Sequence, residues 1–374
     1  MELLSLGLKN FRNFSQKKID FDPKLTVIIG PNGSGKTNIL EAVLLLSGVR
    51  SAKVETDLDL VKFAKSEAKI EGEAAEIGVK NKLTLNMQVF DERFVKKAYF
   101  VNSIKKRFAD FASFASVVVF EPADLDLVAG TPSFRRHHLD SLLCQVDKDY
   151  WRNIGAYQKI IARRNKLLIR IMEGKAKKAE LDFWDLRLLE HGAIVSKKRA
   201  EFFEFLNFVE GGNALYSSSE RSESRSNSSR LRSNDKMWTA PMSDLAFILK
   251  QSELSREKLL RNRDRDIAAG ITLSGPHRDD FRFMHKKHDL AYFGSRGEQR
   301  MAVLSLKLAE LEFVSLKIKS RPILALDDIF SELDWNHRRA VLSTVSKQQT
   351  IVTAAEVDSV PKQLLKKAKV IELV

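Results

Sequence analysis

The 374-residue chain has a single cysteine, Cys144, and no long apolar run. One cysteine cannot form a disulfide within the chain, which fits a reducing compartment. No run approaches the roughly 18 apolar residues that a membrane-spanning helix needs. Residues 1–14 also lack the apolar stretch and the cleavage site of a signal peptide. We therefore expect a cytoplasmic chain without disulfides and without a membrane partner.

Acidic residues are fewer than basic residues. The 49 Asp and Glu residues stand against 63 Lys and Arg, which gives a net charge of +14 and a pI of about 9.6. Residues 151–200 alone carry 13 Lys and Arg against 5 Asp and Glu, a local excess of +8. Such an excess favours a polyanionic partner, nucleic acid before acidic membrane. Taken alone, it could equally serve solubility.

The sharpest motif that is present is GPNGSGKT at residues 30–37, which matches the phosphate-loop pattern GxxxxGK[ST]. It follows the apolar run 25–29 and precedes a predicted helix at 37–47, as the pattern requires. We expect Lys36 to contact the β- and γ-phosphates of ATP and the Thr37 hydroxyl to bind Mg²⁺. A glycine turn with a surface lysine is the alternative. The other residues expected to bind ATP are Gly30, Pro31, Asn32, Gly33, Ser34 and Gly35.

A second apolar run, 323–326, ends in Asp327 and Asp328. A carboxylate there can hold Mg²⁺ directly or through water, so Asp327 would complete the metal site begun by Thr37. Asp328 would orient or deprotonate the attacking water, which makes Lys36, Asp327 and Asp328 the expected catalytic set. A solvated strand end would look the same if it stood alone. The long separation of the two motifs requires an insertion within one nucleotide-binding domain.

The segment GSRGEQR at 294–300 precedes a predicted helix at 298–316. A serine and a glycine at a helix start offer amides to an anion, although alone they indicate only an N-cap. Beside the two motifs above, the segment resembles the signature loop of ABC-type ATPases, and SELD at 331–334 resembles their D-loop. The resemblance implies that Ser295 and Gly297 contact the γ-phosphate of ATP held by a second subunit.

The apolar pattern predicts an α/β fold of two parts. Helical spacing predicts an antiparallel pair at 154–171 and 181–209, and a helix at 253–269 that ends at Gly270. We expect residues 1–125 and 271–374 to form an ABC-type P-loop ATPase head, with 126–270 inserted as a mostly helical lid or arm. Nine of the 19 residues at 217–235 are serine, which predicts a flexible loop, a regulatory or DNA-contacting arm being the alternative. The expected strands are 3–11, 17–29, 68–76, 82–90, 97–102, 117–120, 271–273, 323–326, 351–353 and 370–373.

Further segments narrow the resemblance to the RecF family, in the structural-maintenance branch of the ABC class. They are LKNFRNF at 8–14, TNILEA at 37–42, PADLDLV at 122–128 with Gly130, Pro132, Arg135, Arg136 and Asp140 after it, and SGPHRDD at 274–280. The likeness runs nearly end to end, apart from 217–235. A structural turn is the plain interpretation of SGPHRDD, and the resemblance implies a place near the nucleotide face.

The family resemblance implies a function. ATP would join two copies in a two-fold homodimer that closes on DNA, either duplex or a junction of gapped and single-stranded DNA. Slow, DNA-stimulated hydrolysis would reopen the dimer during repair of gapped DNA and replication-fork recovery. RecO and RecR would be partners.

Three departures from the wider ABC class predict slow hydrolysis. Arg296 replaces a signature glycine, Asp328 stands where most of the class has glutamate, and Ala354 follows the strand that a switch histidine should follow.

Two other functions stay open from the sequence. An ATPase subunit of a membrane transporter would need a membrane partner, against which the basic helical insertion argues. A nucleotide-binding structural protein would not turn ATP over.

Overall fold

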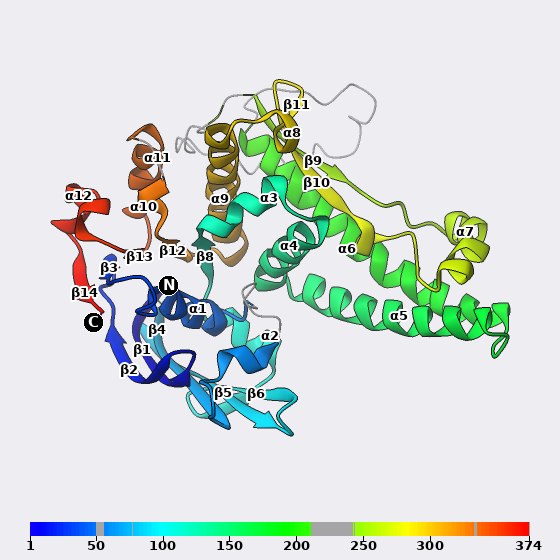
Figure 1. Cartoon of the computed structure of the whole chain (residues 1–374), viewed down its shortest axis with the longest axis horizontal. Coiled ribbons are helices and arrows are strands. Elements are labelled where there is room, and N and C mark those ends of the chain that lie inside the picture. The colour runs from blue at the N-terminus through cyan, green and yellow to red at the C-terminus, as the bar shows by residue number, and fades with distance from the viewer. Residues whose placement is uncertain (50–55, 77, 211–241, 243, 333–334, 374) are drawn as a thin grey trace.

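The strands of the computed structural model form three β-sheets among the residues it describes, which are 1–49, 56–76, 78–210, 242, 244–332 and 335–373. The parallel five-stranded sheet has the order β14-β3-β13-β12-β8 (Figure 1). Its strands are β14 (Lys369–Glu372), β3 (Leu25–Ile29), β13 (Thr350–Ala354), β12 (Ile323–Asp327) and β8 (Val117–Phe120). Because β3 pairs with β13 and β14, the two ends of the chain build one sheet, as predicted.

An antiparallel sheet of six strands lies below it, in the order β2-β1-β4-β5-β6-β7. Its strands are β1 (Glu2–Phe11), β2 (Phe14–Asp20), β4 (Glu67–Glu76), β5 (Val79–Phe90), β6 (Phe94–Val101) and β7 (Ile104–Lys106). Helix α1 (Lys36–Leu46) packs between the two sheets, and its Ile39, Val43 and Leu46 share one buried core with residues of both. This burial fixes the start of α1 against the end of β3.

The other face of the parallel sheet packs on helices. Val27, Leu326 and Val352 belong to a second core with α9, α4 and the base of the arm. The helices around the sheets are α2 (Phe108–Phe111), α3 (Asp126–Ala129), α4 (Pro132–Val146), α8 (Leu290–Phe293), α9 (Arg296–Ile318), α10 (Ile329–Glu332), α11 (Trp335–Val345) and α12 (Lys362–Leu365). The result is an α/β head, in agreement with the fold class that the sequence predicts.

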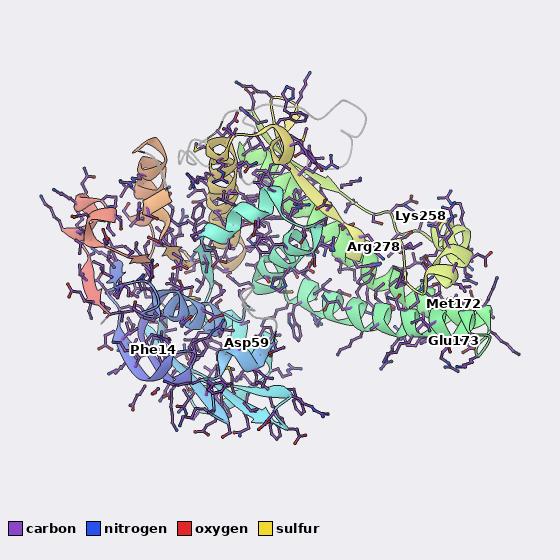
Figure 2. All side chains as sticks on the ribbon, viewed as in Figure 1. Phe14, Asp59, Met172, Glu173, Lys258 and Arg278 are labelled. Carbon is purple, nitrogen blue, oxygen red and sulfur yellow. The ribbon has the colours of Figure 1, made fainter. Side chains whose placement is uncertain are left out.

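The arm projects to one side of the head (Figure 1). It consists of α5 (Lys148–Met172), α6 (Leu181–Glu210) and α7 (Arg256–Ala269), and Figure 2 labels Met172 and Glu173 at its far end. The helical pair is confirmed, as is the end of α7 at Gly270, which has a left-handed backbone. The Phe202 and Leu206 side chains of α6 are buried in the core, as expected from their spacing.

Two predicted strands are wrong. The segment 17–29 is divided into β2 and β3, because Asp22 accepts hydrogen bonds from the Lys24 and Leu25 amides in a turn. The segment 271–273 is irregular, because side chains take its amides: Thr272 N donates to Asn165 Oδ1 (2.9 Å) and Leu273 N donates to Asp266 Oδ1 (3.1 Å).

The sheet β11-β10-β9 was not predicted. Its strands are β9 (Leu245–Lys250), β10 (Asp280–His285) and β11 (His288–Asp289), and it covers α6. Strand β9 lies before the predicted boundary between 270 and 271, and its partner β10 lies after it. The division into a head, 1–125 with 271–374, and an insertion, 126–270, stays a prediction. The serine-rich segment 217–235 lies outside the described residues. Among the helices described, none is long and apolar enough to cross a bilayer.

Candidate nucleotide site

The phosphate-loop motif forms a tight loop between β3 and α1. Gly33 and Gly35 have positive φ angles of 85° and 99°, which glycine adopts without strain. A Cβ at Gly35 would lie 2.5 Å from Phe14 Cζ, so the turn between β1 and β2 packs directly on the loop. Asn13 Nδ2 in that turn donates to Ser34 O (3.3 Å) and holds the loop from the side.

Lys36 is folded back onto its own loop. Its ammonium donates to Gly30 O (2.6 Å) and Pro31 O (3.0 Å), and the residue is 7% exposed. The charged group therefore lies inside the loop, where a lysine of this motif contacts phosphates. When ATP binds, the Lys36 ammonium would exchange its hydrogen bonds to carbonyl oxygens for contacts with phosphate oxygens, and it would stay inside the loop.

The two distant motifs of the expected metal site meet. Thr37 Oγ1 lies 3.1 Å and 3.0 Å from the two carboxylate oxygens of Asp327 and donates to them. Thr353 Oγ1, at the end of the neighbouring strand β13, donates to Asp327 Oδ1 (2.7 Å). The structure thus brings a hydroxyl and a buried carboxylate together at the carboxyl end of the parallel strands, where α/β sheets bind their ligands.

Asp328 leaves the strand with a left-handed backbone, φ 52°. Its amide donates to Thr353 O and to Thr353 Oγ1, both at 3.2 Å. Its Oδ1 is buried and has no hydrogen-bond partner among the described residues. A buried carboxylate oxygen without a donor is costly, which suits a group that works on a bound water or ligand.

These residues fit MgATP. The buried Ser34 Oγ also lacks a partner in the described part of the chain, and a Cβ at Gly30 would fill the loop at 2.7 Å from Leu373 O. Thr37 and Asp327 supply the oxygen ligands that Mg²⁺ prefers. Lys36 supplies a cation, and the N-terminus of α1 supplies amides for phosphate.

The signature-like motif lies at the start of α9, away from the phosphate loop. Ser295 is its N-cap: Ser295 Oγ accepts from Glu298 N (3.3 Å), and Ser295 N donates to Glu298 Oε2 (2.8 Å). The Glu298 carboxylate therefore occupies the helix start where a phosphate is expected. The hydrogen bond from the Ser295 amide is the main cause that lowers the pKa of Glu298. Within the described residues no hydrogen bond joins 295–298 to 30–37. Leu333 and Asp334 of the D-loop motif lie outside the described residues.

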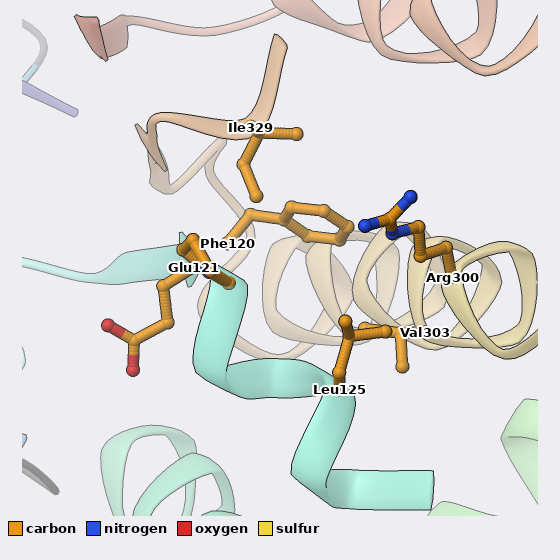
Figure 3. A pocket seen from close by; sticks show the side chains of 7 residues that line it. Phe120, Glu121, Leu125, Arg300, Val303 and Ile329 are labelled. Carbon is orange, nitrogen blue, oxygen red and sulfur yellow. The ribbon is translucent and has the colours of Figure 1, made fainter. Parts of the chain in front are cut away.

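A shallow pocket lies where α9 approaches the ends of β8 and β12 (Figure 3). Arg300 from α9 points toward the Phe120 ring, and Ile329, which follows Asp328, lies on the other side of that ring. The helix that begins at the signature motif thus packs on β8, which is the neighbour of the acid-bearing strand β12.

Comparison with known proteins decides the family. The family model for the RecF/RecN/SMC N-terminal domain matches residues 2–371. A protein of Bacillus cytotoxicus named DNA replication and repair protein RecF is 35% identical over 376 residues, covering 100% of this chain and 97% of its own. A Bacillus anthracis protein of the same name is 35% identical over 378 residues, with the same coverage. The chain belongs to the RecF family.

A solved RecF structure agrees with this assignment. It is described as the recombination mediator protein RecF with ATP in the RecFOR pathway, and it is 28% identical to this chain with a TM-score of 0.80. The match covers 96% of this chain and 93% of that one. The RecF family resemblance drawn from the sequence motifs is therefore confirmed, as is the ABC-type head fold.

The RecF-like residues Arg135, Arg136 and Asp140 meet the segment SGPHRDD at the base of the arm. Arg135 forms two hydrogen bonds to the Asp280 carboxylate (2.6 and 3.0 Å), and Arg136 donates to Asp279 O (2.9 Å). Arg199 of α6, 1% exposed, binds Asp279 (2.8 Å) and Asp140 (2.6 Å). Residues 279 and 280 of SGPHRDD thereby tie α4, α6 and β10 together. Among the described residues no hydrogen bond joins this segment to the phosphate loop, and its place near the nucleotide face stays a prediction.

Sequence reasoning missed Asn13 and Thr353 as supports of the site. Asn13 appeared only within the family-like opening segment, and Thr353 only as part of a strand. A polar residue at the carboxyl end of the strand next to Asp327 would have been the signal for Thr353, but strand order is required to recognise it.

Proposed function

We propose that this chain is an ATP-dependent DNA clamp, which binds MgATP through residues 30–37 and Asp327 and acts in replication and repair of gapped DNA. The observation that carries the proposal is the contact of Thr37 with Asp327, which joins the phosphate loop to the acid-bearing strand. The names of the curated relatives support the repair role, and the ATP-bound RecF structure supports the nucleotide.

Turnover is assigned to three residues. Lys36 neutralises phosphate charge, and Asp327 with Thr37 holds Mg²⁺, which supplies charge stabilisation at the transferred phosphate when bound. Asp328 accepts a proton from the attacking water, since its Oδ1 has no competing donor in the described part of the chain. Its short side chain and the absence of a histidine at position 354 favour slow, switch-like hydrolysis that DNA stimulates.

ATP binding would join two copies about a two-fold axis, with Ser295 and Gly297 of each contacting the γ-phosphate held by the other. The exposed position of Ser295 and Gly297 supports this, because a motif at the surface can meet a second subunit. The dimer would close on duplex DNA or on gapped and single-stranded junctions in the cytoplasm. RecO and RecR are the proposed partners, by family membership and by the RecFOR pathway named for the solved relative.

One experiment tests the clamp. Light scattering measures the dimer, and fluorescence anisotropy measures retention of a gapped duplex, each with ATP and with ADP. We expect a dimer and slow DNA release with ATP only, and no such effect for Lys36→Met. A wild-type protein that stays monomeric and releases DNA equally fast with both nucleotides would refute the clamp.

A further inference from the structure

One face of α5 carries a continuous row of positive charge. The α5 basic stripe consists of Arg152, Lys159, Arg163, Lys166 and Arg170, all of them exposed. At about 100° per residue, these five positions fall within roughly 60° of one another around the helix axis. At about 1.5 Å per residue, they extend along roughly 27 Å of the helix.

The stripe faces away from the arm's own packing. Tyr150, Ile154, Tyr157, Arg164 and Leu168 are the buried α5 positions that contact α6, α7 or the loop at 272, and they lie on the opposite side of the helix. No acidic residue occurs between Tyr150 and Met172. The only acid within α5 is Asp149, in its first turn, which pairs with Arg152.

Most of the stripe is free of carboxylate partners. Among the described residues, Lys159, Lys166 and Arg170 form no ion pair, and the Arg163 guanidinium lies over the Trp184 ring at 5.7 Å from its centroid. Elsewhere on the arm the charges are mixed: α7 carries exposed Glu257 and Asp264 as well as arginines. The unpaired row is therefore a feature of α5 and not of the arm as a whole.

Two further exposed cations lie on the head, beside the start of α5. The Phe108 and Trp151 rings stack at 5.8 Å between centroids, and so they hold α2 against the start of α5. The segment before Phe108 contributes Lys105 and Arg107, both exposed. Arg107 forms an ion pair with Asp110, and Trp151 lies about 100° around the helix from Arg152, so these two cations adjoin the stripe without extending it in line.

We infer that the α5 basic stripe is a contact surface for the phosphate backbone of duplex DNA, which it binds without reading sequence. The inference rests on the proposed function and adds where on the molecule the duplex is bound. A duplex carries one negative charge per about 1.7 Å along its axis, so a linear row of cations about 27 Å long faces phosphates over its whole length. Lys and Arg contact phosphates without sequence information.

Two other polyanions fit the stripe less well. A single strand is bound by stacking on exposed aromatic rings, and the nearby Trp151 and Trp184 rings are engaged by Phe108 and Arg163. A membrane-surface helix needs an unburied apolar face, whereas the apolar face of α5 from Tyr150 to Leu168 is packed inside the arm.

The test uses the full chain with Lys159→Ala and Lys166→Ala together. The matched control is Arg261→Ala with Arg265→Ala, which removes two exposed and unpaired charges from α7 on the same arm. Binding to a 30-base-pair duplex and to a single strand of the same length is measured by anisotropy at several salt concentrations. Circular dichroism and DNA-free ATP turnover check that each variant is folded and active.

We expect the α5 variant to lose about two units of the slope of log affinity against log salt, because two phosphate contacts are removed. Duplex affinity near 0.1 M salt should fall about 10- to 60-fold. The control should stay within about threefold of wild type, and ATP turnover without DNA should not change.

The outcomes separate the two proposals. Wild-type protein that binds no DNA refutes the clamp and the stripe together. Wild-type protein that binds DNA, with an α5 variant equal to it, overturns the stripe and leaves the clamp standing. An equal loss of DNA affinity in the α7 control would show that binding depends on the total charge of the arm and not on the α5 basic stripe. That result would overturn the inference. A loss confined to the single strand would show that the occupant is not a duplex.

Discussion

Asp328 is the residue on which turnover depends in the proposed mechanism. Its positive φ is a conformation that asparagine tolerates at least as well as aspartate, so Asp328→Asn should fold without added strain. The amide cannot take a proton from water. We expect ATP binding by calorimetry to be unchanged, hydrolysis to fall at least about 100-fold, and the ATP dimer to persist.

Lys36→Met is the matched comparison for this variant, since it should lose tight ATP binding itself. If Asp328→Asn hydrolyses ATP at the wild-type rate, the proton acceptor is another residue.

Glu298 places a negative charge where the partner's γ-phosphate is expected. In Glu298→Gln the amide keeps the capping-box hydrogen bonds with Ser295 but carries no charge. We therefore predict that this variant dimerises at an ATP concentration several-fold lower than wild type, measured by light scattering during an ATP titration. Glu298→Ala, which removes the side-chain half of the capping box and leaves the Ser295 N-cap in place, serves as the control for helix stability. A Gln variant that needs more ATP than wild type would show that the carboxylate assists the closed state.

At the level of the elements, local motifs were predictable and contacts between elements were not. The loop at Lys36 follows from a contiguous pattern of strand, glycines and helix, and so the sequence placed it. The support of Asp327 by Thr353 depends on β12 and β13 being neighbours, which no single segment encodes. The β9–β10 pair was missed because its partners are separated by α7 and the irregular segment 271–273. The arm was predictable as two helices, yet the buried arginines that fix its base looked like surface charge.

The base of the arm contains a histidine that should make stability depend on pH. His277 Nε2 donates to Thr272 O (2.8 Å), and its Nδ1 accepts from the Tyr157 hydroxyl (2.7 Å). Burial, with Arg278, Arg136 and Arg164 nearby, lowers the pKa of His277 to about 4. The neutral ring is therefore the form that the fold accommodates.

The unfolded chain binds a proton at its ordinary pKa near 6.5, while the folded chain does not until about pH 4. The free energy of unfolding must then fall as the pH falls from about 6.5 to 4, and be regained above 6.5. We expect wild type to lose about 2–3 kcal/mol more than His277→Gln over that range, measured by urea unfolding at several pH values. Parallel curves for the two proteins would mean that this imidazole does not carry the proton uptake.

For the whole molecule, the clamp requires that each ATP site be built from two chains. Lys36→Met damages the loop of its own chain, and Ser295→Arg damages the surface offered to the other chain. Each variant alone should be inactive. In a mixed dimer one site carries both lesions and the other carries none, so activity should return to at most about a quarter of wild type with random pairing.

ATP turnover in the mixture is the measurement, with cross-linking to confirm that mixed dimers form. No recovery in confirmed mixed dimers would place Ser295 in the site of its own chain. The ATP-binding assignment of residues 30–37 would be unaffected.

The position of β3 between β14 and β13 also affects how this protein is made. Residues 25–29 are synthesised before their neighbours in the sheet, which are residues 350–354 and 369–372. At about 5–20 residues per second, the wait between them is roughly 20–70 s. During that time Val27 and Ile28, which are fully buried in the finished sheet, have no strand to pair with. The nascent chain is thus exposed to misfolding and to chaperones for most of its synthesis. A polypeptide that stops before residue 369 would leave β3 as an open edge, prone to aggregation.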